Sequence, residues 1–203
     1  MEVVVPTYLP NVAYFAWLLQ QEIVPFVANT HYQKQTFRNR TEIYGANGTL
    51  ILTIPVEHRK VESHQQEKEV EICYASNWQK QHWKSLCAAY RSSPFFEFYE
   101  ADLSPFYHKQ TTSLFEYNLS LLNTIYSLLD QEFSYKIHAF TKSEHTLKDT
   151  LFFAKNKQRQ VQNPYTQVFE NKYGFIPNLS VLDVLFNLGP GSLSYLKKGV
   201  YPN

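Results

Sequence analysis

Glycine, methionine and cysteine are scarce in this sequence of 203 residues, which has 6 Gly, 1 Met and 2 Cys. No glycine-rich loop of the Rossmann or P-loop type is present, so neither mode of nucleotide phosphate binding is indicated. The two cysteines, Cys73 and Cys87, form neither a disulfide framework nor a zinc knuckle, and we expect two buried free thiols. With a single methionine, the interior should be rigid rather than adaptable.

Excess charge and long apolar runs are also lacking. Lys and Arg number 19 against 18 Asp and Glu, which gives a net charge of +1 and no basic surface for a nucleic acid partner. No stretch approaches the ~18 apolar residues of a membrane-spanning helix. Residues 1–6 lack the basic segment and apolar run of a signal peptide. We therefore expect a cytoplasmic protein without a transmembrane segment.

Aromatic residues are abundant instead, with 15 Tyr, 15 Phe and 3 Trp. Hydrophobic residues make up 44% of the chain, which is enough to bury a core. Much of the aromatic content must belong to that core, because each ring buries a large apolar area. The length fits one domain that spans residues 1–203.

Residues 1–75 are predicted to be rich in strands, with one early helix that has Asn11 as its N-cap. A short loop connects this helix to the preceding strand, and the N-terminus of a helix in that position favours binding of an anion. The loop has no glycine, so the indication of an anion site is weak. Asn47-Gly48 indicates a turn, and residues 57–69 are predicted to be a solvated loop. The predicted strands are 3–5, 23–28, 36–44, 49–54 and 70–73.

Residues 76–203 are predicted to be mainly helical. Capping boxes are predicted at Ser76 with Gln79 and at Ser180 with Asp183. The sequence thus predicts a mixed α/β fold, with a strand-rich N-terminal part that contains an early strand-loop-helix unit and a mainly helical C-terminal part. The predicted helices are 76–91, 93–101, 113–130, 180–189 and 190–197.

A compact polar segment covers residues 32–40. Alternation on an extended segment would place Lys34, Thr36, Arg38 and Arg40 on one side. Two arginines so spaced make a fork that is suited to a phosphate or carboxylate. The alternative is an edge strand whose charges resist aggregation.

The helix predicted over residues 76–91 carries His82 and Lys84. Histidine is the natural general base near neutral pH, but a histidine on an apolar face is also often a core residue with satisfied hydrogen bonds. His58 and His64 are expected to be solvated. No HExxH, GxSxG or paired CxxC motif is present, and we expect neither a metal site nor a cofactor.

Several motifs, in order along most of the chain, resemble the WbqC-like protein family. Two departures lie in or next to the loop between the first predicted strand and helix: Val5 stands where the family usually has Gln, and Ala13 where it usually has Gly. The matching motifs are Pro6-x-Tyr8-Leu9-Pro10-x-x-x-Tyr14-Phe15, Tyr32-x-Lys34-x-x-Phe37-x-Asn39-Arg40, Leu52-Thr53-Ile54-Pro55-Val56, Trp78-x-x-x-His82-Trp83-Lys84, Tyr90-x-x-x-Pro94-Phe95-Phe96 and residues 174–187 (GFIPNLSVLDVLFN).

The resemblance implies a bacterial protein of O-antigen or other surface-polysaccharide biosynthesis. It suggests a transferase that attaches an amino-acid or acyl group to an activated sugar, which would be its small-molecule substrate. In that reaction His82 would be the general base and Lys34 would stabilise charge. The alternative is a non-catalytic module that binds a glycan or another small molecule. The residues expected to bind substrate are Tyr8, Tyr32, Arg38, Asn39, Arg40 and Lys84.

Overall fold

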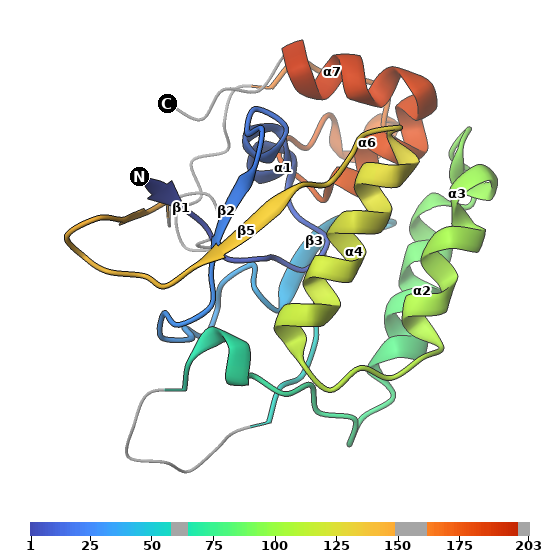
Figure 1. Cartoon of the computed structure of the whole chain (residues 1–203). Coiled ribbons are helices and arrows are strands. Elements are labelled where there is room, and N and C mark those ends of the chain that lie inside the picture. The colour runs from blue at the N-terminus through green and yellow to red at the C-terminus, as the bar shows by residue number, and fades with distance from the viewer. Residues whose placement is uncertain (58–64, 149–161, 199–203) are drawn as a thin grey trace.

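The computed structural model describes residues 1–57, 65–148 and 162–198, and its elements confirm a mixed α/β fold (Figure 1). The α-helices are α1 (Val12–Leu18), α2 (Trp78–Tyr90), α3 (Phe96–Leu103), α4 (Leu114–Leu128), α5 (Glu170–Tyr173), α6 (Val181–Leu188) and α7 (Ser192–Lys198). The short 3-10 helices are η1 (Glu67–Glu69), η2 (Ser104–Tyr107) and η4 (Gly189–Gly191). The strands are β1 (Glu2–Val3), β2 (Val24–Val27), β3 (Arg40–Gly45), β4 (Gly48–Thr53), β5 (Tyr135–His138) and β6 (Thr146–Leu147).

The strands of the described residues form three pairs. β1 pairs in parallel with β6, and β2 pairs in parallel with β5. A bridge between Val4 and Phe26 joins these two pairs, since the Val4 N–H donates to the Pro25 carbonyl. β3 and β4 form a separate antiparallel hairpin. The helical C-terminal part therefore contributes β5 and β6 to the N-terminal strands, which the sequence did not predict.

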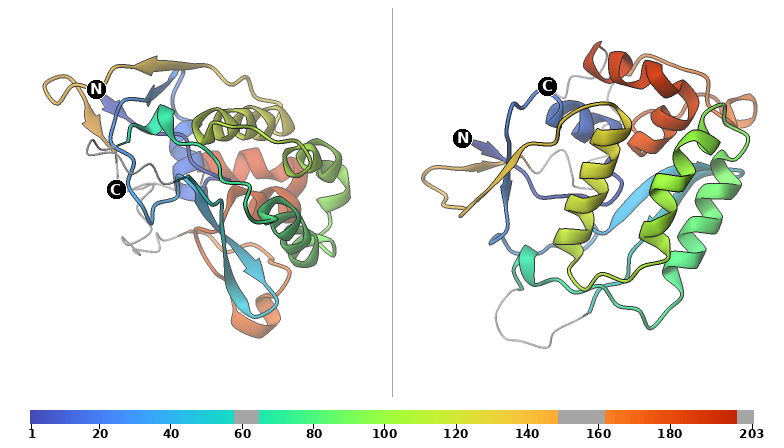
Figure 2. Two further views of the ribbon diagram at one scale, coloured as in Figure 1. Left: turned by 90° about the horizontal axis from the view of Figure 1, so that it is seen from below. Right: turned by 45° about the vertical axis from the view of Figure 1, so that its right-hand side comes forward.

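The helices form two groups around these strands. α2, α3 and α4 lie side by side, while α6 and α7 pack on α1 next to them (Figures 1 and 2). The ring of Phe186 on α6 lies 5.1 Å from the rings of both Tyr90 on α2 and Phe96 on α3, and so joins the two groups. Much of the aromatic content is thus core, as predicted.

Local signals in the sequence placed several of these elements correctly. Asn11 caps α1 by accepting a hydrogen bond from the Tyr14 N–H at 2.9 Å, and Ser113 caps α4 in the same way. The β3–β4 turn has Gly48 at a φ of 96°, a backbone conformation that favours glycine. Cys73 and Cys87 are free thiols, as predicted, but they are half-buried rather than buried.

Two predicted local features are wrong. α2 has Asn77 as its N-cap, and the Ser76–Gln79 capping box does not form. The Gln79 amide instead donates to the Phe106 and Lys109 carbonyls at 2.9 and 2.7 Å, because the chain after α3 returns to the start of α2.

The strand predicted over residues 70–73 is reduced to isolated bridges, one between Val56 and Ile72 and one between Glu71 and Ser113. Among the described residues, no helix is long and apolar enough to cross a membrane.

Candidate functional site

The loop between β1 and α1, residues 5–11, is buried throughout and is called the early loop below. The Tyr8 N–H donates to the Phe37 carbonyl at 3.0 Å, and the Thr41 hydroxyl donates to the Leu9 carbonyl at 2.8 Å. Leu9 has a φ of 40°, so the backbone turns sharply there. These bonds fix the early loop against the polar segment 32–40.

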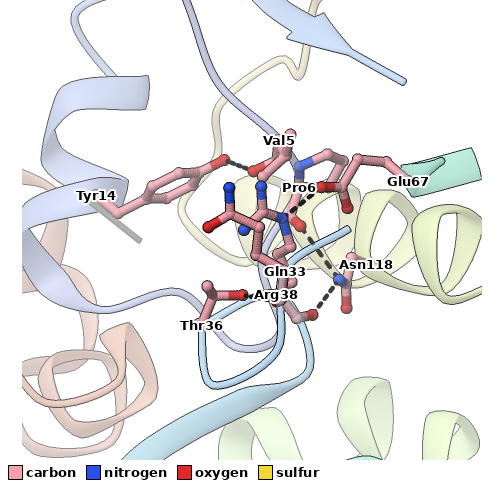
Figure 3. A network of polar contacts seen from close by, with 8 residues as sticks. All are labelled: Val5, Pro6, Tyr14, Gln33, Thr36, Arg38, Glu67 and Asn118. Atoms are coloured by element: carbon pink, nitrogen blue, oxygen red, sulfur yellow. Dashed lines mark hydrogen bonds and ion pairs between the residues drawn. The ribbon is translucent and has the colours of Figure 1, made fainter. Parts of the chain in front are cut away.

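A buried polar network joins the early loop to α4 and η1 (Figure 3). The Asn118 amide on α4 donates to the Arg38 carbonyl at 2.7 Å and to the Pro6 carbonyl at 3.3 Å. Arg38 and Glu67 form an ion pair at 2.5 Å between Nε and Oε1, with side chains that are 1% and 5% exposed. Figure 3 shows the Arg38 guanidinium enclosed between Gln33, Tyr14 and Glu67.

The arginine fork predicted for residues 34–40 does not form. Residues 32–39 are irregular, with Gln35 at a φ of 61°, and β3 begins only at Arg40. Arg38 therefore turns inward to Glu67, while Arg40 stays half-buried. Strict alternation requires an extended backbone, and the turn and bend over residues 37–39 interrupt it between the two arginines.

The prediction of a solvated loop over residues 57–69 is also wrong at its end, because Glu67 is buried. His58 and His64, which we expected to be solvated, lie outside the described residues.

The electrostatics of this region are dominated by burial. Burial raises the pKa of the Glu67 carboxyl to about 7, although the Arg38 guanidinium and a hydrogen bond from Thr30 act to lower it. Burial and the charge of Glu67 raise the pKa of Tyr32 to about 12, against the opposing effect of Arg38 and Arg40. These residues therefore lie within electrostatic reach of one another.

His82 forms a second buried polar group with Tyr8. The Tyr8 hydroxyl lies 2.9 Å from His82 Nδ1 and 3.1 Å from the Tyr107 hydroxyl. Burial lowers the pKa of His82 to about 4, and a hydrogen bond with the Thr53 backbone acts in the opposite direction. His82 is consequently neutral at pH 7, so its Nδ1 can accept a hydrogen bond from the Tyr8 hydroxyl while the ring also bonds the Thr53 backbone.

The predicted site residues thus fall into three groups by exposure. The buried group comprises Tyr8, Arg38, Asn39 and His82; Tyr32 and Arg40 are half-buried; Lys34 and Lys84 are exposed.

The early loop links the buried residues to the half-buried ones, because it contacts His82 on one side and the segment that carries Arg38 and Arg40 on the other. Asn39 fixes the base of the hairpin, because its amide donates to the Ile54 carbonyl at 2.8 Å. Within residues 1–57, 65–148 and 162–198, neither Lys34 nor Lys84 forms a hydrogen bond or ion pair.

Sequence reasoning missed two members of the network, Glu67 and Asn118. Glu67 lies in the polar stretch 57–69, whose composition predicts a solvated loop. Asn118 did carry a signal, because it is a polar residue on the apolar face of α4. A polar group on such a face needs a buried partner, and here it bonds two backbone carbonyls.

The N-terminus of α1 is occupied by the chain itself, so the anion site considered for it does not form. The Val12 N–H donates to the Leu179 carbonyl and the Ala13 N–H to Asn178 Oδ1, both at 2.9 Å. Asn178 holds a left-handed backbone with a φ of 57°. The segment that precedes α6 therefore closes the first turn of α1.

Asp183 departs from the capping role that the sequence predicted. Ser180 does accept a hydrogen bond from the Leu182 N–H at 3.3 Å. The Asp183 carboxylate instead accepts hydrogen bonds from the Tyr165 hydroxyl at 2.5 Å and from the Gln167 amide at 2.8 Å. Burial raises the pKa of Asp183, while these hydrogen bonds lower it. This carboxylate stabilises the segment that closes α1.

Among the residues whose placement is described, no group of three or more His, Cys, Asp or Glu side chains is arranged to hold a metal ion.

Comparisons with known proteins agree with the family motifs between residues 6 and 96, while the motif at residues 174–187 lies outside the matched range. A model of the WbqC-like protein family matches residues 6–158. A protein of Mycobacterium tuberculosis (strain ATCC 25618 / H37Rv) named "Uncharacterized protein Rv1507c" is 27% identical over 224 aligned residues, which cover 96% of each chain. No solved structure matches the chain significantly. The family match includes residues 6–11 of the early loop, the Arg38–Glu67 pair and the Tyr8–His82 pair.

Proposed function

Because the chain belongs to the WbqC-like protein family, we propose that it is a transferase of bacterial surface-polysaccharide biosynthesis, of the O-antigen type. It would attach an amino-acid or acyl group to an activated sugar. The observation that supports this proposal is the buried Arg38–Glu67 pair beside Arg40 and Tyr32. Buried ion pairs are often no more stabilising than apolar residues of similar volume, whereas strongly perturbed carboxyl groups beside a cation are typical of active sites.

Arg40 and Tyr32 are the residues that we expect to contact the substrate. Both are half-buried, and the Arg40 Nε has no hydrogen-bond acceptor among the described residues. A guanidinium suits the phosphate of an activated sugar or the carboxylate of an amino acid. Lys34 belongs to the same segment and is exposed, so it would add positive charge at the rim.

Two groups compete for the role of general base. His82 is neutral at pH 7, but a pKa of about 4 makes it a weak base, and the Tyr8 hydroxyl occupies its Nδ1. A general base works best when its pKa lies near the working pH, and Glu67, with a pKa of about 7, meets that condition better. We therefore propose Glu67 as the base and His82 as the residue that positions Tyr8.

A non-catalytic binding module is the second candidate. The full burial of Tyr8 and the two-sided contacts of His82 favour it, because packing alone would explain both residues. This alternative predicts saturable ligand binding without turnover. The binding should not change when Glu67 or His82 is replaced.

The test begins with a thermal-shift screen against nucleotide sugars, nucleotides, coenzyme A thioesters and amino acids. A ligand at about 100 times its dissociation constant adds about 2.7 kcal/mol to the free energy of unfolding. The shift should disappear in Arg40→Ala and persist in Arg91→Ala, whose side chain is 66% exposed at the end of α2. A shift that survives Arg40→Ala would exclude Arg40 from the binding site.

Turnover then separates the enzyme from the binding module. With the ligand pair from the screen, Arg40→Ala and Glu67→Gln should each lower kcat/KM at least ~100-fold. The wild-type profile of kcat/KM should show a limb near pH 7, which Glu67→Gln would abolish. Binding without any turnover would support the module, and a limb that Glu67→Gln leaves in place would exclude Glu67 as the base.

A further inference from the structure

The two charged residues of β3 lie on the same face of the strand. Arg40 and Glu42 are half-buried, whereas Thr41 and Ile43, which alternate with them, are buried. The Thr41 hydroxyl bonds the Leu9 carbonyl, so this face of β3 looks toward the early loop and the charged residues look the other way. The Cα atoms of Arg40 and Glu42 are about 7 Å apart, because each residue advances a strand by about 3.4 Å.

Arg40 and Glu42 carry opposite charges, and neither charge is neutralised within the described part of the chain. No ion pair joins the two side chains, and neither forms a side-chain hydrogen bond or ion pair with another described residue. The hairpin register places Thr53 opposite Arg40 and Ile51 opposite Glu42, so no charge faces them across the hairpin. A guanidinium and a carboxylate are therefore both free to bind a ligand on one face.

Protection of the strand edge does not explain these charges. Charged side chains discourage the addition of another strand where the backbone groups of an edge are open. The outer edge of β3 is already covered, since the Glu42 carbonyl accepts from the Ser180 N–H at 2.8 Å. The Tyr44 N–H on the same edge donates to the Tyr90 hydroxyl at 3.1 Å. β3 thus needs no charge to keep other strands away.

The face that carries the two charges is bounded at both ends and exposed between them. At one end Tyr44 is buried, and its hydroxyl donates to the Gly174 carbonyl at 2.7 Å, in the segment that lies beside the hairpin (Figure 2). At the other end, burial raises the pKa of Tyr32 to about 12, while the nearby charge of Arg40 acts to lower it. Between these ends Ile51 is 50% exposed, so a ligand can reach the face from solvent.

We propose that Arg40 and Glu42 form a two-point site for one substrate molecule, in which Arg40 binds an anionic group and Glu42 binds a primary ammonium group on the neighbouring carbon atom. The inference rests on the proposed transferase function and adds Glu42 as a residue that determines specificity. Two charge-assisted hydrogen bonds of about 2.8 Å each leave room between the side chains for such a ligand. An α-amino acid and the 1-phosphate of a 2-amino sugar share this chemistry.

Glu42 makes the site selective in two ways. Its carboxylate attracts the ammonium group, and it repels an anion that brings no amine. A plain sugar phosphate or an N-acylated amino acid would gain at Arg40 and lose at Glu42, whereas the amine-bearing ligand gains at both. Arg40 alone would accept either kind of anion.

Isothermal titration of the full chain with two matched ligand pairs tests the site. Alanine differs from N-acetylalanine, and glucosamine 1-phosphate from glucose 1-phosphate, by a free amine. In at least one pair, the wild type should bind the amine-bearing member at least ~10-fold more tightly, which is the value of one charge-assisted hydrogen bond. The pair that shows the preference identifies the ligand as an amino acid or as an amino-sugar phosphate.

Glu42→Gln should remove the preference. The amine-bearing ligand should bind at least ~10-fold more weakly, while its partner without the amine should bind equally well or better. A purely structural role of Glu42 would weaken both ligands alike, so the diagnostic result is that loss of the amine and loss of the carboxylate are not additive. Glu97→Gln, at an exposed carboxylate of α3, is the matched control and should keep the wild-type preference.

The outcomes separate this inference from the proposed function. The two-point site is wrong if neither pair shows a preference in the wild type, or if Glu42→Gln keeps the preference. A ligand whose binding is lost in Arg40→Ala but unchanged in Glu42→Gln would overturn the role of Glu42 and leave the transferase proposal intact. Coupled binding at both residues without any turnover would support the two-point site and remove the transferase.

Discussion

Replacing Glu67 with Gln tests whether burial or the attraction to Arg38 controls the central ion pair. The two effects have opposite signs. The guanidinium favours the carboxylate, while burial, with only 5% of the Glu67 side chain exposed, favours the neutral acid. Burial wins in this structure, because the pKa of Glu67 lies at about 7 rather than at its ordinary value of 4.5.

The sign of the pH dependence follows from linkage. A carboxyl whose pKa is higher in the folded state binds its proton more tightly there, so it stabilises the fold at low pH. That stabilisation is lost as the pH rises from 4.5 through about 7. At about 1.4 kcal/mol per pH unit, the loss is about 3 kcal/mol. Glu67→Gln keeps the shape and cannot ionise, so its stability relative to the wild type should rise by about 3 kcal/mol between pH 4 and pH 8.

Urea unfolding at constant ionic strength measures this difference at each pH. Glu97→Gln is the control, because Glu97 is an exposed carboxylate of α3 and its replacement should change stability by no more than about 0.5 kcal/mol at any pH. The opposite slope would refute the reasoning. If Glu67→Gln lost stability relative to the wild type as the pH rises, the attraction to Arg38 would outweigh burial, and removal of the carboxylate would cost about 3 kcal/mol or more.

Two further predictions concern other buried features. Tyr8→Phe removes the hydroxyl that bonds His82 and Tyr107, and leaves these two buried groups without that partner. The free energy of unfolding, measured in urea, should fall by about 2–4 kcal/mol. A loss below about 1 kcal/mol, the value of one ordinary hydrogen bond, would contradict this prediction. Gly189→Ala should lower the free energy of unfolding by about 3 kcal/mol or more, because the new Cβ would lie 2.4 Å from the Phe95 ring at a φ of 51°. Gly174→Ala, at a φ of 70° with open space around the Cβ, should lower it by only about 1 kcal/mol. Equal changes in the two thermal midpoints would refute the steric reasoning.

The elements that the sequence predicted well are those whose signals are local. Asn11 caps α1 and Gly48 supports the hairpin turn because capping and left-handed backbone depend on a few neighbouring residues. β5 and β6 were missed because parallel pairing joins residues more than 100 positions apart, as between Val24 and Tyr135. In addition, β5 has four residues and β6 only two, and neither shows a regular alternation of buried and exposed positions.

The candidate site was predictable in its residue types but not in its geometry. Tyr8 of the early loop does contact His82, and its backbone bonds the segment that carries Arg38 and Arg40. Which of them face inward depends on partners elsewhere in the chain, such as Glu67. Alternation treats segment 32–40 as an extended strand, whereas residues 37–39 form a turn and a bend that separate Arg38 from Arg40.

This separation of the two arginines bears on how the site would work. Arg38 is 1% exposed, and its guanidinium is already engaged with Glu67, so it is not available to bind the anionic group of a substrate. Arg40 begins β3, whose outer edge is held by Ser180 and Tyr90 at its next two outward residues, so its backbone is fixed while its side chain stays half-buried. A binding residue on a rigid strand loses little entropy when it meets a ligand. Arg38 is then best understood as the charge that keeps Glu67 in place, and Arg40 as the cation available to an anionic substrate.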